Sequence, residues 1–185
     1  MRGVLKAAAQ AAGWQAKPPA RREWPRRGKV SGRGVACVAY EGHNGYAAGV
    51  AEVEVDLESG EVHPRQFFCA LDVGPISNPD GLRNQIEGGL LQGMSRVLGE
   101  EVTWDKTKVT SVDWSGYHSL YFNYTMPSVT SVLLNQDNVP ATGAGETAIT
   151  LAPALLANAI FDATGARVRS APFTPERVKA ALKEG

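Results

Sequence analysis

The sequence contains few residues of the kinds that bind metals. It has two cysteines, Cys37 and Cys69, and no C-x-x-C pair, so the chain alone cannot hold an iron–sulfur cluster or a cysteine zinc site. Its three histidines, His43, His63 and His118, lack the spacing of metal ligands. We therefore expect no metal bound by protein side chains. Both cysteines stand in apolar surroundings, and we interpret them as buried strand thiols.

Long apolar runs and an excess of charge are also absent. No run of about 18 apolar residues is present, so no transmembrane helix is expected, and the N-terminus lacks the apolar core of an export signal. Basic and acidic residues number 19 each, which gives a net charge of zero and no whole-chain signature of nucleic-acid or membrane binding. We predict a globular cytoplasmic protein, or a periplasmic one if it is exported with a partner.

Basic residues are concentrated near the N-terminus. Apolar spacing predicts a helix over residues 3–14 that ends at Gly13. Residues 15–33 are rich in proline, arginine and glycine and indicate a linker or wrapped arm. No aromatic pattern supports nucleic-acid binding, so this segment is either solvated or packed on an acidic partner surface. We therefore divide the chain into a helix and basic linker arm, residues 1–33, and a main part, residues 34–185.

The main part begins with alternating apolar and polar residues. This period of two predicts an antiparallel strand meander with strands over 35–40, 47–56 and 62–72. Residues 58–60 form the connecting hairpin turn between the second and third of these strands.

The next segment has helical spacing. A helix is predicted over 81–98, with Asp80 as its N-cap. Its apolar face is formed by Leu82, Ile86, Leu90, Met94 and Val97. Four glycines oppose helix propensity, so we expect another backbone or a ligand to approach closely there; they are Gly81, Gly88, Gly89 and Gly93.

Shorter elements complete the prediction. Residues 101–104 and 108–113 indicate a second hairpin, and 131–134 a further strand. A last helix is expected from Pro153 to about residue 164. The predicted fold is therefore α+β, an antiparallel strand meander with packed helices.

One short motif combines two glycines with a carboxylate: Gly143-Ala144-Gly145-Glu146. Glycine tolerates positive φ and lets a backbone approach a ligand closely. A carboxylate between such a turn and a buried helix is expected at the wall of a site, where burial raises its pKa and suits it to act as a general base. Glu146 is therefore a candidate base. The alternative is an ordinary turn before a helix.

A second motif lies within the predicted helix, Gln85-Ile86-Glu87-Gly88-Gly89. The amide of Gln85, beside paired glycines, can donate to and accept from a polar ring system. A surface glutamine on a tightly packed helix is the alternative. Phosphate binding at the glycine turn is not supported, because no Lys-Ser/Thr pair follows the glycines and Glu146 would repel phosphate.

Together these segments resemble the molybdenum-binding subunit of molybdenum hydroxylases, the xanthine dehydrogenase and aldehyde oxidase superfamily. The closest resemblance is to bacterial isoquinoline 1-oxidoreductase, nicotinate dehydrogenase and aldehyde dehydrogenase type subunits. It covers about residues 34–182, and it rests on Asp72-Val73-Gly74, Asn78-Pro79-Asp80, Gln85 to Gly89, Gln92-Gly93, Gly143 to Glu146 and the tail Ala152 to Arg169. The family's molybdenum-binding chain is several times longer. The resemblance therefore implies a C-terminal portion, as a natural split subunit, a truncated product or an excised domain.

The resemblance also implies roles for individual residues. In the family a pterin dithiolene holds the molybdenum, without a side-chain ligand. The glutamate matching Glu146 is the general base in the oxidation of an aldehyde or N-heteroaromatic carbon with water-derived oxygen. The glutamine matching Gln85 hydrogen-bonds the cofactor, and the turn of Gly143, Ala144 and Gly145 lies against it.

The implied cofactor is molybdopterin in its cytosine dinucleotide form, with iron–sulfur clusters and any FAD on partner chains. The implied partners are the N-terminal portion of the molybdenum subunit, an iron–sulfur subunit and a small aldehyde or N-heterocycle, but no nucleic acid. Thr147 stands where the family most often has proline, which implies a looser turn. The alternative function is an inert, partner-binding remnant. Retention of both Glu146 and the glycine turn favours the enzyme.

Overall fold

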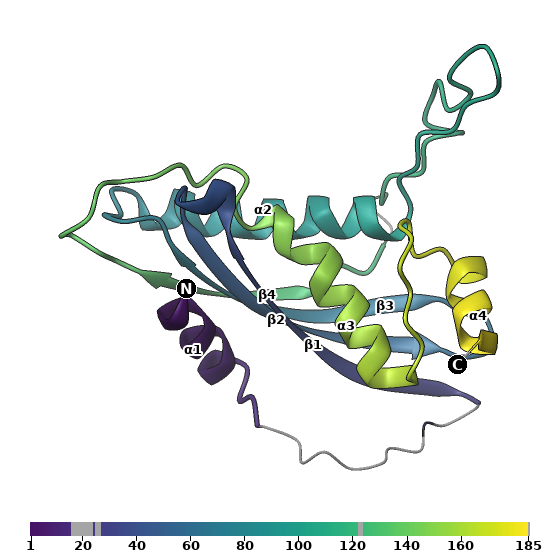
Figure 1. Cartoon of the computed structure of the whole chain (residues 1–185), viewed down its shortest axis with the longest axis horizontal. Coiled ribbons are helices and arrows are strands. Elements are labelled where there is room, and N and C mark those ends of the chain that lie inside the picture. Colours follow the sequence, from purple (N-terminus) through teal and green to yellow (C-terminus); the bar gives the residue numbers. More distant parts are fainter. Residues whose placement is uncertain (16–23, 25–26, 122–123, 185) are drawn as a thin grey trace.

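A four-stranded sheet in the order β1-β2-β3-β4 organises the computed structural model (Figure 1), which describes residues 1–15, 24, 27–121 and 124–184. Strands β1 to β3 are antiparallel, and β4 pairs with β3 in parallel. The elements are α1 (Arg2–Ala11), β1 (Lys29–Ala39), η1 (Tyr40–Gly42), β2 (Tyr46–Asp56), β3 (Val62–Asp72), α2 (Pro79–Leu98), β4 (Ser128–Leu134), η2 (Ile149–Leu151), α3 (Ala152–Thr164) and α4 (Pro175–Glu184).

The sheet has helices on both faces, because successive side chains of a strand point to opposite sides. On one face, Val4 and Ala8 of α1 pack on Ala48 of β2 and Ala70 of β3. The other face joins α2 and α3 in the larger core. The largest fully buried side chains of that core are Phe67, Leu71, Ile86, Leu90, Met94, Leu151, Leu155, Leu156 and Ile160, each of which contributes about 1.5–3 kcal/mol on burial.

Helix α3 lies so close to β1 that glycine is required between them. A Cβ at Gly34 would stand 2.1 Å from the carbonyl oxygen of Leu155, and one at Gly32 would stand 2.3 Å from that of Ala159. The Nδ2 of Asn158 also donates to the carbonyl oxygen of Val35 at 3.0 Å. These contacts fix α3 along the strand, and with it the segment that leads into its N-terminus.

The predicted α+β fold and the three-strand meander are confirmed. Strand β1 is longer than expected, since it begins at Lys29 and not at residue 35. Strand β4 begins at Ser128, and its parallel pairing was not predicted. Parallel strands need a long connection, and here α2 and the following loop provide it. Most of the predicted linker arm, residues 16–23 and 25–26, lies outside the described residues.

The predicted helix over 81–98 is confirmed as α2, but the predicted N-cap is wrong. The helix begins at Pro79, and the Oδ1 of Asn78 accepts a hydrogen bond from the backbone N–H of Gly81 at 2.9 Å. Proline fits the first helical turn because its missing N–H has no partner to lose there. Asp80 therefore lies inside the helix, near its positive end.

The close approach expected at the helical glycines is confirmed at two of them. A Cβ at Gly93 would stand 2.7 Å from the Cβ of Ala152 and 2.8 Å from the carbonyl oxygen of Ile149, and one at Gly89 would stand 3.2 Å from the nitrogen of Ile149. Gly88, in contrast, faces open space. The approaching chain is η2 and the start of α3, so these glycines bring α2 against the segment that follows Glu146.

Four other predictions have mixed outcomes. The helices α1 and α3 are confirmed, while α4 was not predicted. The prediction of a second hairpin with two regular strands is wrong. Within the described part of this segment only one antiparallel bridge forms, between Trp104 and Val109. The segment is instead part of a projecting loop, residues 101–121 (Figure 1), which we call the projecting loop throughout. Cys69 is buried as expected, but Cys37 is exposed on the edge strand β1.

Candidate functional site

Three loops meet at one end of the sheet: residues 40–45 between β1 and β2, residues 73–78 between β3 and α2, and residues 135–148 after β4. The backbone N–H of Thr142 donates to the carbonyl oxygen of Val73 at 2.9 Å. The backbone N–H of Ile76 donates to Oδ1 of Asn135 at 2.8 Å. These bonds hold the third loop, which carries Glu146, along the second (Figure 1).

Glu146 is paired with a residue that the sequence pattern does not single out. The hydroxyl of Tyr40 donates to Oε2 of Glu146 at 2.7 Å. In the sequence, Tyr40 is only the last residue of a predicted strand. The available signal was a tyrosine just before a turn that contains Gly42 and Gly45. That signal does not identify Glu146 as the partner of Tyr40, because the two residues lie 106 positions apart in sequence.

Glu146 stands on an anchored segment. The next residues, Thr147 and Ala148, are 1% and 2% exposed. The carbonyl oxygen of Thr147 accepts a hydrogen bond from Oγ1 of Thr150 at 2.8 Å. Gly45 has a φ of 106°. It also leaves room for Thr147, because a Cβ at Gly45 would stand 3.4 Å from the Oγ1 of Thr147. Thr147 is packed beneath the loops, and the looser turn that the resemblance implies at this position remains a prediction.

Gln85 and Gly145 are brought together across the two motifs. A Cβ at Gly145 would stand 3.9 Å from Nε2 of Gln85, and one at Gly143 would meet nothing within 4 Å. Neither Gly143 nor Gly145 has a positive φ, so the expected conformational need for glycine is wrong there. What these glycines provide is open space above the backbone. Ala144, between them, packs partly into the main core.

The motif residues form one open surface. Gln85, Gly143, Gly145 and Glu146 are all exposed. The burial expected for Glu146 is therefore not supplied by the described residues of this chain. Within that part of the chain, no hydrogen-bond partner occupies the amide of Gln85. The carboxylate is held at one oxygen, and a free amide faces the same surface.

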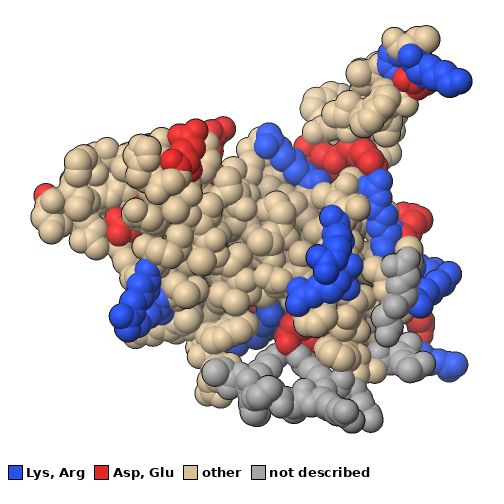
Figure 2. All heavy atoms as spheres, viewed as in Figure 1, with Lys and Arg blue, Asp and Glu red and all other residues tan. Residues whose placement is uncertain are grey.

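The charges that act on Tyr40 at this surface are negative. The hydrogen bond to Glu146 raises the pKa of Tyr40 to about 12, with further contributions from burial and from the negative charges of Glu146 and Glu41. The phenol therefore stays protonated, and able to donate, over the physiological pH range. In the view of Figure 2, most Lys and Arg side chains lie over the half of the molecule that contains α4 and the C-terminal end of α3. The loops described above lie in the other half.

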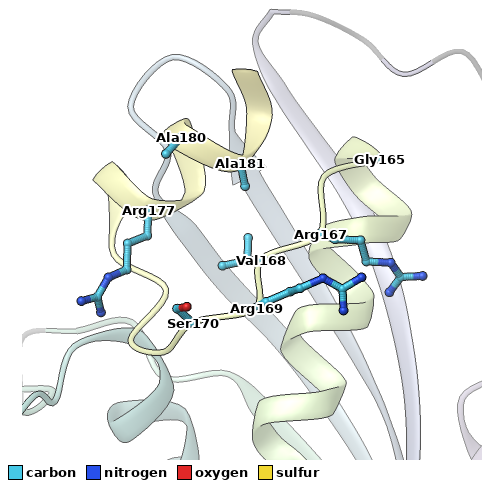
Figure 3. A pocket seen from close by; sticks show the side chains of 8 residues that line it. All are labelled: Gly165, Arg167, Val168, Arg169, Ser170, Arg177, Ala180 and Ala181. Carbon is cyan, nitrogen blue, oxygen red and sulfur yellow. The ribbon is translucent and has the colours of Figure 1, made fainter. Parts of the chain in front are cut away.

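A hollow of about 620 Å³ lies at that basic end and is lined in part by Arg167, Arg169 and Arg177 (Figure 3). The Arg167 guanidinium lies 3.4 Å from the centroid of the Phe161 ring. Arg177 donates to Oε1 of Glu101 at 2.7 Å and points away from the other two arginines. Two of the three cations are thus used within the fold. The length of α3, about 20 Å, separates this hollow from Glu146.

In the described part of the chain, no three His, Cys, Asp or Glu side chains are grouped so that they could hold a metal ion. Among the described helices, none is both long and apolar enough to span a membrane. Where the two motifs meet, the groups available for chemistry are the Glu146 carboxylate, the Tyr40 phenol and the Gln85 amide, beside an open glycine backbone.

Known proteins share this sequence and fold. Residues 41–126 match the molybdopterin cofactor-binding domain family. The chain is 38% identical, over 97% of its length, to a nicotinate dehydrogenase chain of Pseudomonas putida, and 31% identical, over 83%, to the beta chain of isoquinoline 1-oxidoreductase from Brevundimonas diminuta. The crystal structure of quinoline 2-oxidoreductase from Pseudomonas putida 86 superimposes with a TM-score of 0.69 at 27% identity, and the match covers 76% of this chain and 19% of that one.

The chain spans 16% and 20% of the length of the two curated relatives. Its sequence likeness to them runs through the sheet, through α2 with Gln85 and through most of the remaining chain. The family resemblance drawn from the sequence segments is confirmed. The chain belongs to the molybdopterin-binding domains of the xanthine dehydrogenase and aldehyde oxidase superfamily.

Proposed function

We propose that this chain forms one wall of the active site of a molybdenum hydroxylase, with Glu146 as the general base. The substrate class is an aldehyde or an N-heteroaromatic compound, oxidised at an electron-poor carbon with oxygen derived from water. The observation that carries the proposal is the orientation of Glu146. Its Oε2 accepts a hydrogen bond from the Tyr40 hydroxyl at 2.7 Å, while Glu146 remains exposed and directly follows Gly145, which lies near the amide of Gln85.

The residues present fit a bulky polar cofactor. Gly143 leaves the space above its Cα empty, and Gly145 has only the amide of Gln85 near it. A planar pterin system presents donors and acceptors along its edge, and a free side-chain amide can pair with both kinds. Gln85 and the backbone of residues 143–145 would hold the cofactor, which we infer to be the cytosine dinucleotide form of molybdopterin.

When bound, molybdopterin supplies the metal that delivers the oxygen atom and takes up the two electrons of the oxidation. The chain's own contribution is proton transfer. An ionised carboxylate with one unoccupied oxygen can accept a proton from a group placed within about 2.6–3.2 Å. Thr147 and Ala148, buried beneath the loops, anchor the backbone from which that carboxylate extends.

The rest of the active site would come from other polypeptide. The relatives are about five to six times longer than the matched part, so we propose that their remaining molybdenum-subunit sequence, an iron–sulfur subunit and any FAD-bearing chain have counterparts that bind here. The exposed apolar residues of the projecting loop support such a partner. The alternative function is that of an inert domain that only binds a partner. It predicts the same exposed apolar surface, but turnover of the assembly would then not depend on Glu146.

Substitution of Glu146 by glutamine in the assembled enzyme separates these two functions. The amide has the size of the carboxylate but cannot take up a proton at neutral pH. We expect folding and molybdenum content to remain nearly unchanged, and kcat/KM to fall by a factor of about 10² to 10⁴, the usual contribution of a general base. Near-full turnover at full molybdenum occupancy would show that Glu146 is not the base.

Two further variants serve as comparisons. Gln85→Ala is expected to reduce molybdenum content more than it reduces turnover per bound molybdenum, because it removes a cofactor contact. Glu58→Gln changes an exposed carboxylate in the β2–β3 turn and should alter neither quantity. Steady-state kinetics with metal analysis on all three variants therefore distinguishes loss of the base from loss of the cofactor.

A further inference from the structure

Tyr40 contacts the proposed base directly, and nothing in the family resemblance assigned it a role. We propose that Tyr40 is a positioning residue that holds Glu146 by Oε2 and leaves Oε1 as the oxygen that accepts the proton. This inference rests on the proposed function of Glu146. It adds a residue that lies 106 positions away in sequence, and it assigns different tasks to the two carboxylate oxygens.

The backbone around Tyr40 is held firmly. Its N–H donates to the carbonyl oxygen of Gly45 at 3.0 Å, and its carbonyl oxygen accepts from the N–H of Asn44 at 2.8 Å. The next residue, Glu41, has φ of 47°, a left-handed conformation that non-glycine residues seldom adopt. The side chain of Asn44 donates to Oε2 of Glu41 at 2.8 Å and stabilises this corner. A corner fixed in this way presents the phenol in one direction.

The other end of the contact is equally fixed. Glu146 precedes the buried pair Thr147 and Ala148, and the segment packs under Gly45, in the same corner that carries Tyr40. The two anchored backbones therefore meet through one exposed hydrogen bond. Without that bond, the Glu146 side chain would be free to rotate, because its carboxylate is open to solvent. The phenol removes this freedom before a substrate arrives.

The direction of the hydrogen bond suits a group that must take up a proton. The phenol donates to Oε2 and leaves the lone pairs of Oε1 free to accept the proton. Oε2 can keep this bond after Oε1 has taken up a proton, so the contact persists through the transfer. The two charged groups that act on Tyr40 are Glu146 and Glu41, both negative, and they keep the phenol protonated. Tyr40 is thus a donor throughout the neutral range.

Tyr40→Phe removes the hydroxyl and keeps the ring. In the assembled enzyme we expect unchanged molybdenum content and a fall in kcat of about 10-fold to 100-fold with little change in KM. Tyr46→Phe, at the start of the next strand, is the matched control and should leave both kcat and KM unchanged.

A second measurement needs no cofactor. Tyrosine labelled at the ring carbon that bears the hydroxyl gives an NMR signal that moves when the phenol ionises, and Tyr40→Phe identifies the signal of Tyr40. In the full chain we expect this signal to remain unmoved up to about pH 11, since the pKa of Tyr40 is raised to about 12. In Glu146→Gln it should begin to move about one pH unit below the ordinary tyrosine pKa of about 10, because the negative acceptor is gone. Glu41→Gln should have a smaller effect, because Glu41 makes no hydrogen bond to the phenol.

The outcomes separate this inference from the proposed function. If Glu146→Gln abolishes turnover while Tyr40→Phe retains the full rate, and the titration of Tyr40 does not depend on Glu146, the role of Tyr40 is overturned and Glu146 remains the base. If Glu146→Gln retains turnover, the proposed function fails whatever the titration shows. A Tyr40→Phe enzyme with lowered kcat and little change in KM, together with a Tyr40 titration that depends on Glu146, supports both.

Discussion

Single glycines decide how closely the layers of this protein approach each other. Gly34 of β1 faces the backbone of α3, and a Cβ there would stand 2.1 Å from the oxygen of Leu155 and 2.4 Å from the nitrogen of Ala159. Neither atom belongs to a flexible side chain, so relief of the clash requires the whole helix to shift. Because α3 follows directly from the segment of Glu146, such a shift would also disturb the proposed site.

Gly34→Ala is therefore expected to lower the free energy of unfolding by about 1–3 kcal/mol, the usual cost of overpacking. The matched control is Gly88→Ala, at an exposed helical position where a Cβ meets nothing within 4 Å. Alanine there should raise stability by about 0.5–1 kcal/mol, because it has the higher helix propensity. Urea unfolding of the two variants checks both signs. Equal effects would contradict the close packing of α3 on β1.

The two cysteines differ in reactivity because of their positions in the sheet. Cys37 is exposed on the edge strand, whereas burial raises the pKa of the Cys69 thiol to about 12. Thiolates are the reactive form. We expect iodoacetamide to label Cys37 in the native protein and Cys69 only in denaturant, as mass spectrometry of tryptic peptides would show. Equal labelling without denaturant would mean that the core around Cys69 opens readily.

At the scale of elements, α2 is delimited by a cap that lies two residues before the one predicted from the sequence. The Oδ1 of Asn78 accepts from the N–H of Gly81 at 2.9 Å, and Pro79 fills the first helical position. The capped end of α2 faces the same loops as the proposed site. Capping therefore stabilises the loop cluster as well as the helix.

Asn78→Ala is expected to reduce the free energy of unfolding by about 0.5–2 kcal/mol, since it leaves a helix N–H without its partner. Asp80→Asn should cost less, about 0.3–1 kcal/mol, because Asp80 lies in the first turn of the helix and interacts there with its positive end. Thermal or chemical unfolding of both variants measures this order. A larger loss for Asp80→Asn would restore the N-cap predicted from the sequence.

The whole molecule has one large feature that its own described residues do not cover. In the projecting loop, Trp104 is 74%, Val112 77% and Trp114 69% exposed. Its conformation is nevertheless defined, by the bridge between Trp104 and Val109 and by turns in which Asp105 and Asp113 accept backbone N–H groups. Ordered and exposed tryptophans are typical of the centre of a protein interface.

We expect the chain alone to bind molybdopterin poorly and to associate with the remaining molybdenum-subunit polypeptide over about 2,000 Å² or more, as obligate interfaces do. Metal analysis and co-purification test this. The double variant Trp104→Ser, Trp114→Ser should weaken the association at least about 10-fold, while Leu5→Ser on α1 should not. Purification of the lone chain as a soluble monomer with stoichiometric molybdenum would contradict the proposal that this chain provides only part of the cofactor site.

The sequence by itself determined the elements whose signals are local. Alternation and apolar spacing predicted β2, β3, α2 and α3, since each buries a face that its own residues define. The motif order identified the family, and it named Gln85 and Glu146 as candidates. The proposed roles of these two residues remain predictions, although the structure brings their motifs to one surface.

Only the tertiary structure decided which distant residues meet. The pairing of Tyr40 with Glu146, the parallel pairing of β4 with β3 and the exposure of Cys37 all depend on contacts between segments far apart in sequence. A local pattern states how a segment can bury its apolar face, but not which other segment covers it. Burial and hydrogen bonding between remote residues follow from the packing of the whole chain, which is why the sequence pattern pointed to the carboxylate and not to the phenol that holds it.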